Sequence, residues 1–211
     1  MVYGTQAGDA VPEVADARQV VWLVRHGEST WNAAGLAQGH CDKARLTRRG
    51  VRQARDVADR LSGRPIGALY ASDLRRALAT AAPLASVLGL ATVRDARLRE
   101  RCLGHLEGAA TAAVTPSVSG ISANRVVDPD ARPPGGESLR DFYLRVAGFA
   151  ADLEAVGPGP GAAPGEIAIV AHGGTLRMLS ACLRGVPVEQ MAWEPLGNAC
   201  ILRCPTQLRN S

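Results

Sequence analysis

Stretches of consecutive apolar residues alternate along the chain with stretches whose apolar residues recur every three or four positions. The consecutive runs predict buried β-strands at 20–24, 66–71 and 167–171, a short strand near 91–93 and a last strand at 198–204. A strand that is apolar at every position has both faces covered, as in a parallel sheet. The pattern therefore indicates a mostly parallel sheet that is packed on both sides.

The periodic stretches between these strands predict amphipathic helices. Four are expected, over 47–61, 72–88, 137–156 and 175–183. Thr47 and Ser72 stand where an N-cap is needed, and their hydroxyls suit that role. Pro83 lies inside the second helix and is expected to kink it.

The length and the order of elements predict one domain. A chain of 211 residues fits a single core, and strands that alternate with helices predict the α/β class, here a three-layer α/β/α sandwich around a mostly parallel central sheet. Residues 1–18 are small, polar and aperiodic, and are expected to form a flexible N-terminal segment ahead of the domain at 19–211. Residues 109–134 predict a lid, and the Gly/Pro run at 157–161 predicts a linker.

Composition narrows the kinds of partner. Lys and Arg outnumber Asp and Glu by 24 to 20, which favours small anions and is too small an excess to indicate nucleic acid. With 4% aromatic residues, stacking platforms for single-stranded nucleic acid are scarce. The five cysteines fit neither a disulfide framework nor a zinc site, which favours a reduced, cytoplasmic setting. Neither a signal peptide nor a membrane span is recognisable, so no membrane partner is expected.

Two of the predicted strands end in His-Gly immediately before a helix. The unpaired N–H groups at such a helix start form an anion site. After the first strand, Arg25 can grip two phosphate oxygens, Gly27 allows close backbone approach and Asn32 can donate from the next turn. His26 lies at the centre of this site, and His172 occupies the equivalent place after the later strand. A lone histidine is usually structural, whereas this recurrence indicates a functional pair.

Five motifs in a fixed order carry a resemblance to a known family. They are Arg-His-Gly-Glu at 25–28, Ser-Asp-Leu-Arg-Arg-Ala at 72–77 followed by Thr80, Leu-Arg-Glu at 98–100, Gly-Glu-Ser at 136–138 and Ala-His-Gly-Gly at 171–174. From about residue 20 to residue 204 the chain resembles the histidine phosphatase superfamily, in the branch that holds phosphoglycerate mutases, α-ribazole phosphatases and broad-specificity phosphatases. The resemblance implies a phosphoglycerate mutase-like fold.

The resemblance also implies a role for each matching residue. His26 would be the nucleophile that is transiently phosphorylated, and Glu100 would protonate the leaving alcohol and then deprotonate the attacking water. The other catalytic positions are Arg25, Arg76 and His172, and the substrate-binding positions are Asn32, Gln38, Gly39, Glu28 and Gly173. His26 must attack as neutral imidazole, so its far nitrogen needs an acceptor that fixes the tautomer. No metal and no cofactor is implied, because arginines supply the positive charge.

Some of these residues have a second interpretation. Glu100 lies in a run of alternating charge that is typical of an exposed edge strand, and Glu28 is a competing acid that more often supports a helix N-terminus. His40 is expected to be an exposed loop residue. Cys41 and Cys102 are either cleft residues that oxidation would affect or inert small apolar residues.

The lid sequence helps to distinguish hydrolysis from phosphoryl transfer between hydroxyls. The long insertion typical of phosphoglycerate mutases is absent between residues 107 and 135, and only Arg125 and Arg132 could meet a second acidic group there. This favours metal-independent hydrolysis of small phosphomonoesters through phosphohistidine. A phosphoglycerate mutase and a weakly catalytic regulator that binds phosphorylated ligands are the alternatives. Because 109–123 contains no aromatic residue, either a small or apolar leaving group or loose specificity is expected. The expected partner is the small-molecule substrate, and the resemblance also allows a homodimer.

Overall fold

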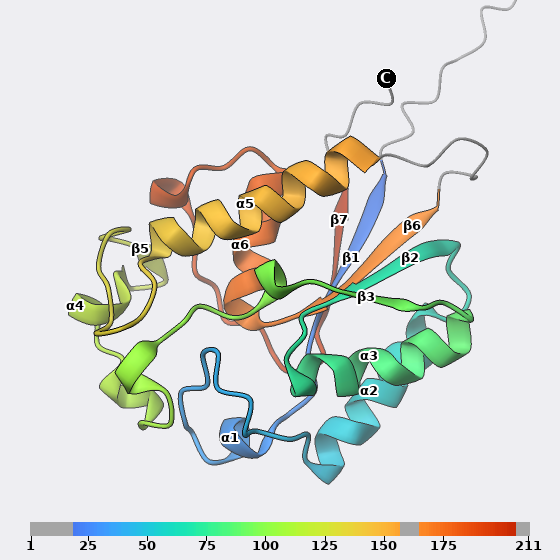
Figure 1. Cartoon of the computed structure of the whole chain (residues 1–211), viewed down its shortest axis with the longest axis horizontal. Coiled ribbons are helices and arrows are strands. Elements are labelled where there is room, and N and C mark those ends of the chain that lie inside the picture. Colours follow the sequence, from blue (N-terminus) through green and yellow to red (C-terminus); the bar gives the residue numbers. More distant parts are fainter. Residues whose placement is uncertain (1–18, 157–164, 206–211) are drawn as a thin grey trace, which may run out of the picture.

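The computed structural model describes residues 19–156 and 165–205 (Figure 1). The segment expected at 1–18 and the linker expected at 157–161 lie outside the described residues. Within the two described ranges, no helix is long and apolar enough to cross a membrane.

A five-stranded sheet forms the centre of the molecule, in the order β3-β2-β6-β1-β7. The strands are β1 Val20–Arg25, β2 Ile66–Ala71, β3 Thr92–Arg94, β6 Glu166–Ala171 and β7 Ile201–Pro205. The first four are parallel to one another, and β7 pairs antiparallel with β1 at one edge. The sequence predicts each of these strands, and the mostly parallel arrangement is confirmed.

Helices fill the connections between the strands. The α-helices are α1 Thr30–Ala33, α2 Arg48–Leu61, α3 Arg75–Leu88, α4 Pro116–Ser119, α5 Leu139–Val156 and α6 Gly173–Leu183. Short 3-10 helices occur at η1 Ala96–Leu98, η2 Gly104–Leu106, η3 Thr111–Ala113 and η4 Val188–Gln190. Thr47 caps α2 as predicted, because its hydroxyl accepts from Gly50 N at 3.0 Å.

The side chains of the sheet alternate between two apolar cores. Val21 and Leu23 of β1 point into a core shared with α5 and α6. Trp22 and Val24 point into a second core shared with α2 and α3. Figure 1 shows the two helix pairs on opposite sides of the sheet. The three-layer α/β/α sandwich is therefore confirmed, and the uninterrupted apolar run of β1 is explained by burial on both faces.

Ser72 does not cap α3, contrary to the sequence-based prediction. The helix begins at Arg75 with Leu74 at its N-cap and no side-chain cap bond. The Ser72 hydroxyl instead accepts from Leu74 N at 3.3 Å and lies 2.9 Å from His172 Nε2, at the carboxyl end of β2. The helix then runs through Pro83 without interruption.

Three element boundaries also differ from prediction, each for a local reason. Helix α5 starts at Leu139 because Ser138 and Asp141 exchange backbone-to-side-chain hydrogen bonds of 2.9 and 3.0 Å ahead of it. Helix α6 starts at Gly173 rather than 175, directly after β6. Strand β7 starts only at Ile201, because Ala199 has a φ of +57° that interrupts extended backbone.

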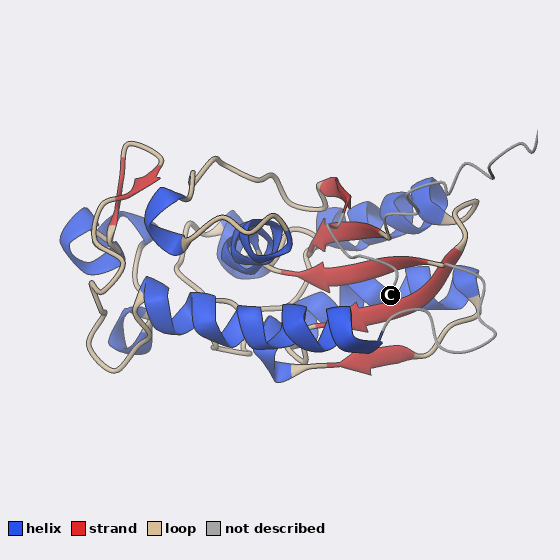
Figure 2. Cartoon of the chain, turned by 90° about the horizontal axis from the view of Figure 1, so that it is seen from above, coloured by secondary structure: helices blue, strands red, loops and turns tan. Residues whose placement is uncertain are grey.

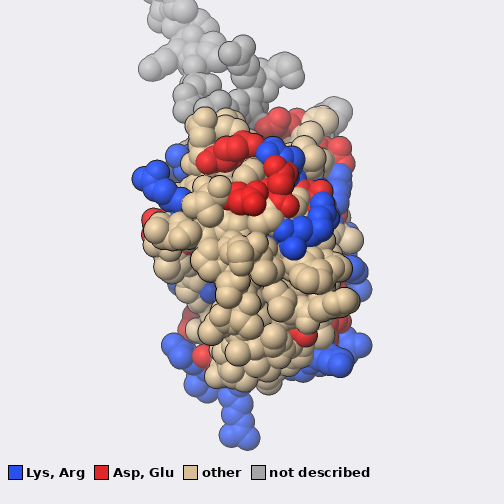
Figure 3. Space-filling view, turned by 90° about the vertical axis from the view of Figure 1, so that its left-hand side faces the viewer, with Lys and Arg blue, Asp and Glu red and all other residues tan. Residues whose placement is uncertain are grey.

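The lid at 109–134 holds more regular structure than its sequence predicts. It contains η3, α4 and a hairpin of β4 Ile121–Ser122 and β5 Arg125–Val126. Ala123 and Asn124, at φ +47° and +58°, form the two-residue turn of this hairpin. Figure 2 shows these elements gathered at one end of the molecule, and Figure 3 shows that this end has a broad surface without charged side chains.

Arg101 holds the lid against the rest of the domain through hydrogen bonds. The residue is 4% exposed, and its guanidinium donates to the carbonyls of Ser119 at 2.5 Å, Ala131 at 2.7 Å and Glu137 at 2.7 Å. Ser119 and Ala131 belong to the lid, whereas Glu137 precedes α5. A single buried cation therefore holds three carbonyls from two parts of the chain.

Replacing Arg101 with alanine should loosen the lid. Three carbonyls lose their donor, and each unpaired buried group costs about 1–3 kcal/mol. We expect limited proteolysis within 109–134 to become faster by at least roughly tenfold, since opening governs cleavage. Arg125→Ala, at an exposed position on the same lid, is the matched control. Equal cleavage rates in the two variants would contradict this account.

Candidate active site

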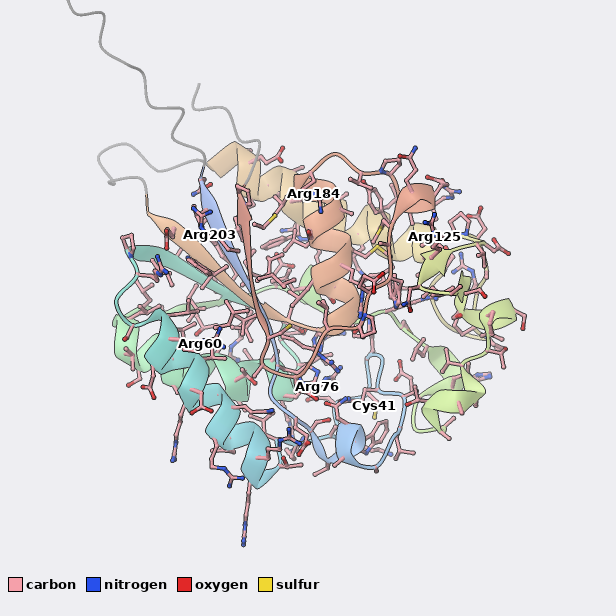
Figure 4. The ribbon with its side chains drawn as sticks, turned by 180° about the vertical axis from the view of Figure 1, so that it is seen from behind. Cys41, Arg60, Arg76, Arg125, Arg184 and Arg203 are labelled. Atoms are coloured by element: carbon pink, nitrogen blue, oxygen red, sulfur yellow. The ribbon has the colours of Figure 1, made fainter. Side chains whose placement is uncertain are left out.

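A cavity of about 310 Å³ opens at the carboxyl ends of β1 and β6, where ligands bind in open α/β sheets. It is lined by most of the residues that the sequence singles out: Arg25, His26, Asn32, Gln38, Gly39, Arg76, Glu100, His172 and Gly173. Figure 4 shows Arg76 below the strand ends, beside the loop that carries Cys41. The predicted residues are thus brought together from segments far apart in the sequence.

The His26 ring is held in one tautomer. Its Nδ1 lies 2.8 Å from the carbonyl of Gly27, and because a carbonyl can only accept, Nδ1 carries the proton. Nε2 therefore keeps a lone pair, and it forms no hydrogen bond with a described residue. Burial, with the positive charges of Arg76 and Arg25, lowers the pKa of His26 to about 3. The ring is neutral near pH 7 and has the acceptor that a histidine nucleophile requires.

Gly27 is required by the packing of its loop on α2. A Cβ at this position would lie 2.5 Å from the carbonyl oxygen of Gly50 in α2. The Gly27 N–H donates to the hydroxyl of Thr80 at 3.0 Å, and that hydroxyl donates to the carbonyl of Arg76 at 2.8 Å. Gly27 therefore lets the His26 loop pack closely against α2 and α3, and its approach to a ligand stays a prediction.

Arg76 and His172 form one buried unit, at 1% and 0% exposure. Arg76 Nε donates to His172 Nδ1 at 3.2 Å, so the neutral ring carries its proton on Nε2, next to Ser72. The other two nitrogens of Arg76 donate to the carbonyls of Gly39 and Cys41, at 2.8 and 2.9 Å. Each of these nitrogens keeps a second N–H. The His172 and His26 ring centroids are 5.1 Å apart.

Arg25 and Asn32 supply further donors. Arg25 Nη1 donates to the carbonyl of Leu196, while its Nε is buried without a partner in the described chain. The Asn32 oxygen accepts from Ser29 N at 3.1 Å and from Asn198 Nδ2 at 3.0 Å. With the oxygen so engaged, the amide nitrogen of Asn32 is the end left for a ligand. A buried, unpartnered guanidinium nitrogen is costly unless an anion meets it.

The carboxylate of Glu100 lies against the first turn of α6. Its Oε2 accepts from Gly174 N at 2.9 Å, and its Oε1 accepts from Arg101 N at 2.9 Å. Thr175 fixes the preceding residue, because its hydroxyl donates to the carbonyl of Arg99 at 2.9 Å. Glu100 is thus a cavity residue held at a helix start and does not belong to an exposed edge strand.

Comparison with known proteins identifies the family. The model of the histidine phosphatase superfamily, branch 1, matches residues 21–207. The chain belongs to this superfamily. A probable phosphoglycerate mutase of Yersinia pestis is 36% identical over 189 residues, which cover 89% of this chain and 85% of that protein.

Solved structures agree with this assignment. A mycobacterial glucosyl-3-phosphoglycerate phosphatase in complex with VO3 has a TM-score of 0.77 at 34% identity, covering 88% of this chain and 90% of that chain. The α-ribazole phosphatase of Shigella flexneri has a TM-score of 0.75 at 28% identity, covering 92% of this chain and 96% of that chain. The phosphoglycerate mutase-like fold that the resemblance implied is therefore confirmed.

Gln38 and Gly39 form the wall of the histidine phosphatase cavity opposite α6. Gln38 is 9% exposed, and its Oε1 accepts from the Ser29 hydroxyl at 2.9 Å. Gly39 has a φ of +51°, and a Cβ there would collide with the carboxylate of Glu107. Both features require a glycine, whose carbonyl then holds Arg76.

Other predicted residues lie away from the cavity. The Glu28 carboxylate accepts from the Thr47 hydroxyl at 2.7 Å and from Arg49 Nη1 at 3.3 Å, so it supports the start of α2 and does not line the site. Cys41 and Cys102 do not line it either. His40 is not an exposed residue: 27% of its side chain is accessible, and it lies 3.9 Å from Glu137.

Sequence reasoning missed several residues around the cavity. Arg177 and Trp193 line it, and Asn198 donates to the His26 carbonyl at 3.3 Å. Arg177 follows the second His-Gly by one helical turn, and this spacing could have revealed it. Trp193 and Asn198 lie in an irregular loop with no periodic signal. Trp193 adds an aromatic wall to the cavity from outside 109–123, the segment that the sequence shows to lack aromatic residues.

The unfolding free energy of this histidine phosphatase should decrease as the pH falls below about 6.5. The unfolded chain binds a proton at His26 near that ordinary pKa, whereas the folded state does so only near its pKa of about 3. Between these values stability drops by up to about 1.4 kcal/mol per pH unit, and above 6.5 His26 contributes no slope. The pKa of buried His172 is lowered too, which acts in the same direction.

Urea unfolding at about pH 7.5, 6.5 and 5.5 measures this slope. In His26→Gln the slope should become shallower. His105→Gln, which changes an exposed histidine, should keep the wild-type slope. A slope unaffected by the His26 change would contradict the account.

Proposed function

We propose that this chain is a metal-independent phosphomonoesterase that hydrolyses small phosphorylated metabolites through a phosphohistidine at His26. The observation that carries the proposal is the state of the His26 ring, which is neutral, fixed through Nδ1 on the Gly27 carbonyl, and near the guanidinium groups of Arg25 and Arg76. A lone pair beside two cations suits attack on a dianion that would otherwise repel a nucleophile.

The first step transfers the phosphoryl group to the enzyme. The His26 Nε2 lone pair attacks phosphorus while the bond from phosphorus to the leaving oxygen breaks. Protonated Glu100 gives its proton to that oxygen, so the product leaves as an alcohol. Arg25, Arg76 and the Asn32 amide would stabilise the charge on the equatorial oxygens.

The second step releases phosphate. The Glu100 carboxylate takes a proton from water, whose oxygen attacks the phosphohistidine. The phosphorus–nitrogen bond breaks and the electron pair returns to Nε2. Inorganic phosphate leaves, and both His26 and Glu100 regain their starting protonation states.

Phosphate release from a panel of phosphomonoesters, with and without excess EDTA, tests the proposal. Arginines supply the positive charge, and no group of three or more His, Cys, Asp and Glu in the described chain is placed to hold a metal ion. We therefore expect rates with EDTA to stay within about twofold of those without it. Loss of activity that a divalent metal restores would contradict the mechanism.

A mutase is the second candidate, favoured by the name of the Yersinia pestis relative. A mutase must keep the phosphoryl group from water and return it to another hydroxyl. The lid offers few cations to retain a doubly phosphorylated intermediate, since Arg132 is paired with Asp141 and Arg125 is exposed. Formation of 2-phosphoglycerate from 3-phosphoglycerate, faster than phosphate release, would establish the mutase and overturn hydrolysis.

A further inference from the structure

Arg177 is a cavity residue that the proposed mechanism does not use. It lies one turn into α6, and helical side chains lean toward the helix N-terminus, here toward the catalytic cavity. Its Nε donates to the carbonyl of Glu194 at 2.7 Å, and its Cζ lies 5.0 Å from the Trp193 ring centroid. The hydrogen bond therefore holds the Nε edge of the guanidinium, and the Trp193 ring covers one of its faces. Both terminal nitrogens remain available to bind a ligand.

Arg177 lies next to another guanidinium. A Cβ built on Gly173 would be 3.2 Å from Arg177 Nη1 and 3.5 Å from Arg25 Nε, so the two arginines flank the same glycine. Neither forms an ion pair with a carboxylate of the described chain, whereas Arg99, Arg140 and Arg145 all do. Two adjacent guanidinium groups repel each other, and in this cavity the Glu100 carboxylate attracts both of them. Once Glu100 is protonated, as the proposed first step requires, a bound anion is needed to offset the repulsion.

The charges of the cavity exceed what one phosphate needs. Arg25, Arg76, Arg101 and Arg177 line it, but the guanidinium of Arg101 is directed at the carbonyls of Ser119, Ala131 and Glu137, which leaves three arginines for a ligand. The two histidines are neutral, and the proposed first step requires protonated Glu100. Three positive charges then face a phosphomonoester that carries about two negative charges near pH 7. One further negative charge balances the site, which fits a carboxylate. A second phosphate would instead bring roughly two.

We propose that Arg177 binds a carboxylate on the leaving group, so that the substrates are phosphate monoesters of small hydroxy acids. This inference rests on the proposed function. Arg177 presents the two terminal nitrogens that pair side by side with a carboxylate, and Trp193 holds the guanidinium plane. The lid side of the cavity adds the apolar residues Leu103, Val114 and Ile121, which suit the carbon skeleton of such an acid.

Matched substrate pairs test the inference. In each pair one member has the carboxylate and the other lacks it: 3-phosphoglycerate against glycerol 3-phosphate, and phosphoserine against phosphoethanolamine. We expect wild-type kcat/KM to favour the carboxylate member by roughly 10- to 100-fold, the range for a charge-assisted hydrogen-bonded pair. In Arg177→Gln this ratio should fall to within about threefold of unity, with little change for the member that lacks the carboxylate.

Two further variants sharpen the test. Arg177→Lys keeps the charge but not the fork, and should keep part of the preference. Arg184→Gln, which changes the exposed arginine at the far end of α6 (Figure 4), should keep all of it. Equal loss on both members of a pair in Arg177→Gln would overturn the inference, as would a wild-type enzyme that hydrolyses both members equally well. Wild-type hydrolysis without preference leaves the phosphatase proposal intact, whereas no hydrolysis of any phosphomonoester defeats both.

Discussion

Replacing His26 with alanine should lower the phosphatase rate by about 10⁴-fold or more, because the variant lacks the atom that accepts the phosphoryl group. The fold should survive, since the only side-chain hydrogen bond of His26 within the described residues is to the neighbouring Gly27 carbonyl, and its contact with another element is one ring packed against His172. Steady-state phosphate release, together with a far-ultraviolet dichroism spectrum and a thermal melt, measures both expectations.

His105 is the matched control for that experiment. It is exposed on η2 and does not line the cavity. His105→Ala should turn over within about twofold of the wild type. A folded His26→Ala variant with a near-wild-type rate would remove His26 from the role of nucleophile.

Replacing Glu100 with glutamine should slow alkyl phosphates by about 10²- to 10⁴-fold, the usual contribution of a general acid. Aryl phosphates should lose far less in the phosphoryl-transfer step, because a phenolate leaves without a proton. Glutamine keeps the shape of the side chain and can still accept one of the two N–H bonds, from Gly174 or from Arg101. Single-turnover rates on an alkyl and an aryl phosphate measure the difference.

Glu28 provides the control carboxylate. It is bonded to Thr47 and Arg49 and does not line the cavity, so Glu28→Gln should slow neither substrate class by more than about twofold. Equal losses on alkyl and aryl phosphates in Glu100→Gln would show that another group is the acid.

The centre of the sheet is predictable because β1 and β6 are buried on both faces. Val21 and Leu23 point to one core and Trp22 and Val24 to the other, so each position from 21 to 24 of β1 must be apolar. Such a run is visible without any knowledge of tertiary structure. Element ends are less predictable, because they depend on single bonds such as the reciprocal pair between Ser138 and Asp141.

The lid could not be predicted, because tertiary contacts shape it. The β4-β5 hairpin turns at Ala123 and Asn124 with positive φ at both, without the glycine that usually marks such a turn. Its position depends on Arg101, whose three carbonyl partners are scattered along the chain. A single arginine gives no sequence signal that it is buried.

The candidate site likewise has one part that the sequence predicts and another part that it does not. His26, Glu100 and His172 lie in local motifs, so their presence near one cavity can be expected from sequence. Residues that reach the cavity from outside those motifs cannot be recognised from a local sequence pattern. Trp193 lies in a loop that is held by tertiary bonds: its N–H donates to the Asn124 carbonyl of the lid at 2.7 Å, and the Glu194 carbonyl accepts from Arg177.

Trapping the covalent enzyme tests the phosphohistidine mechanism most directly. Glu100→Gln should transfer the phosphoryl group from an aryl phosphate but lack the base that activates water, so the phosphoenzyme should accumulate. Mixing this variant with an aryl phosphate labelled in its phosphoryl group, quenching in alkali and sequencing the labelled peptide locates the bond. The account predicts an acid-labile label on His26, absent from a variant that also carries His26→Ala. A label on another residue, or an active enzyme that never becomes labelled, would contradict it.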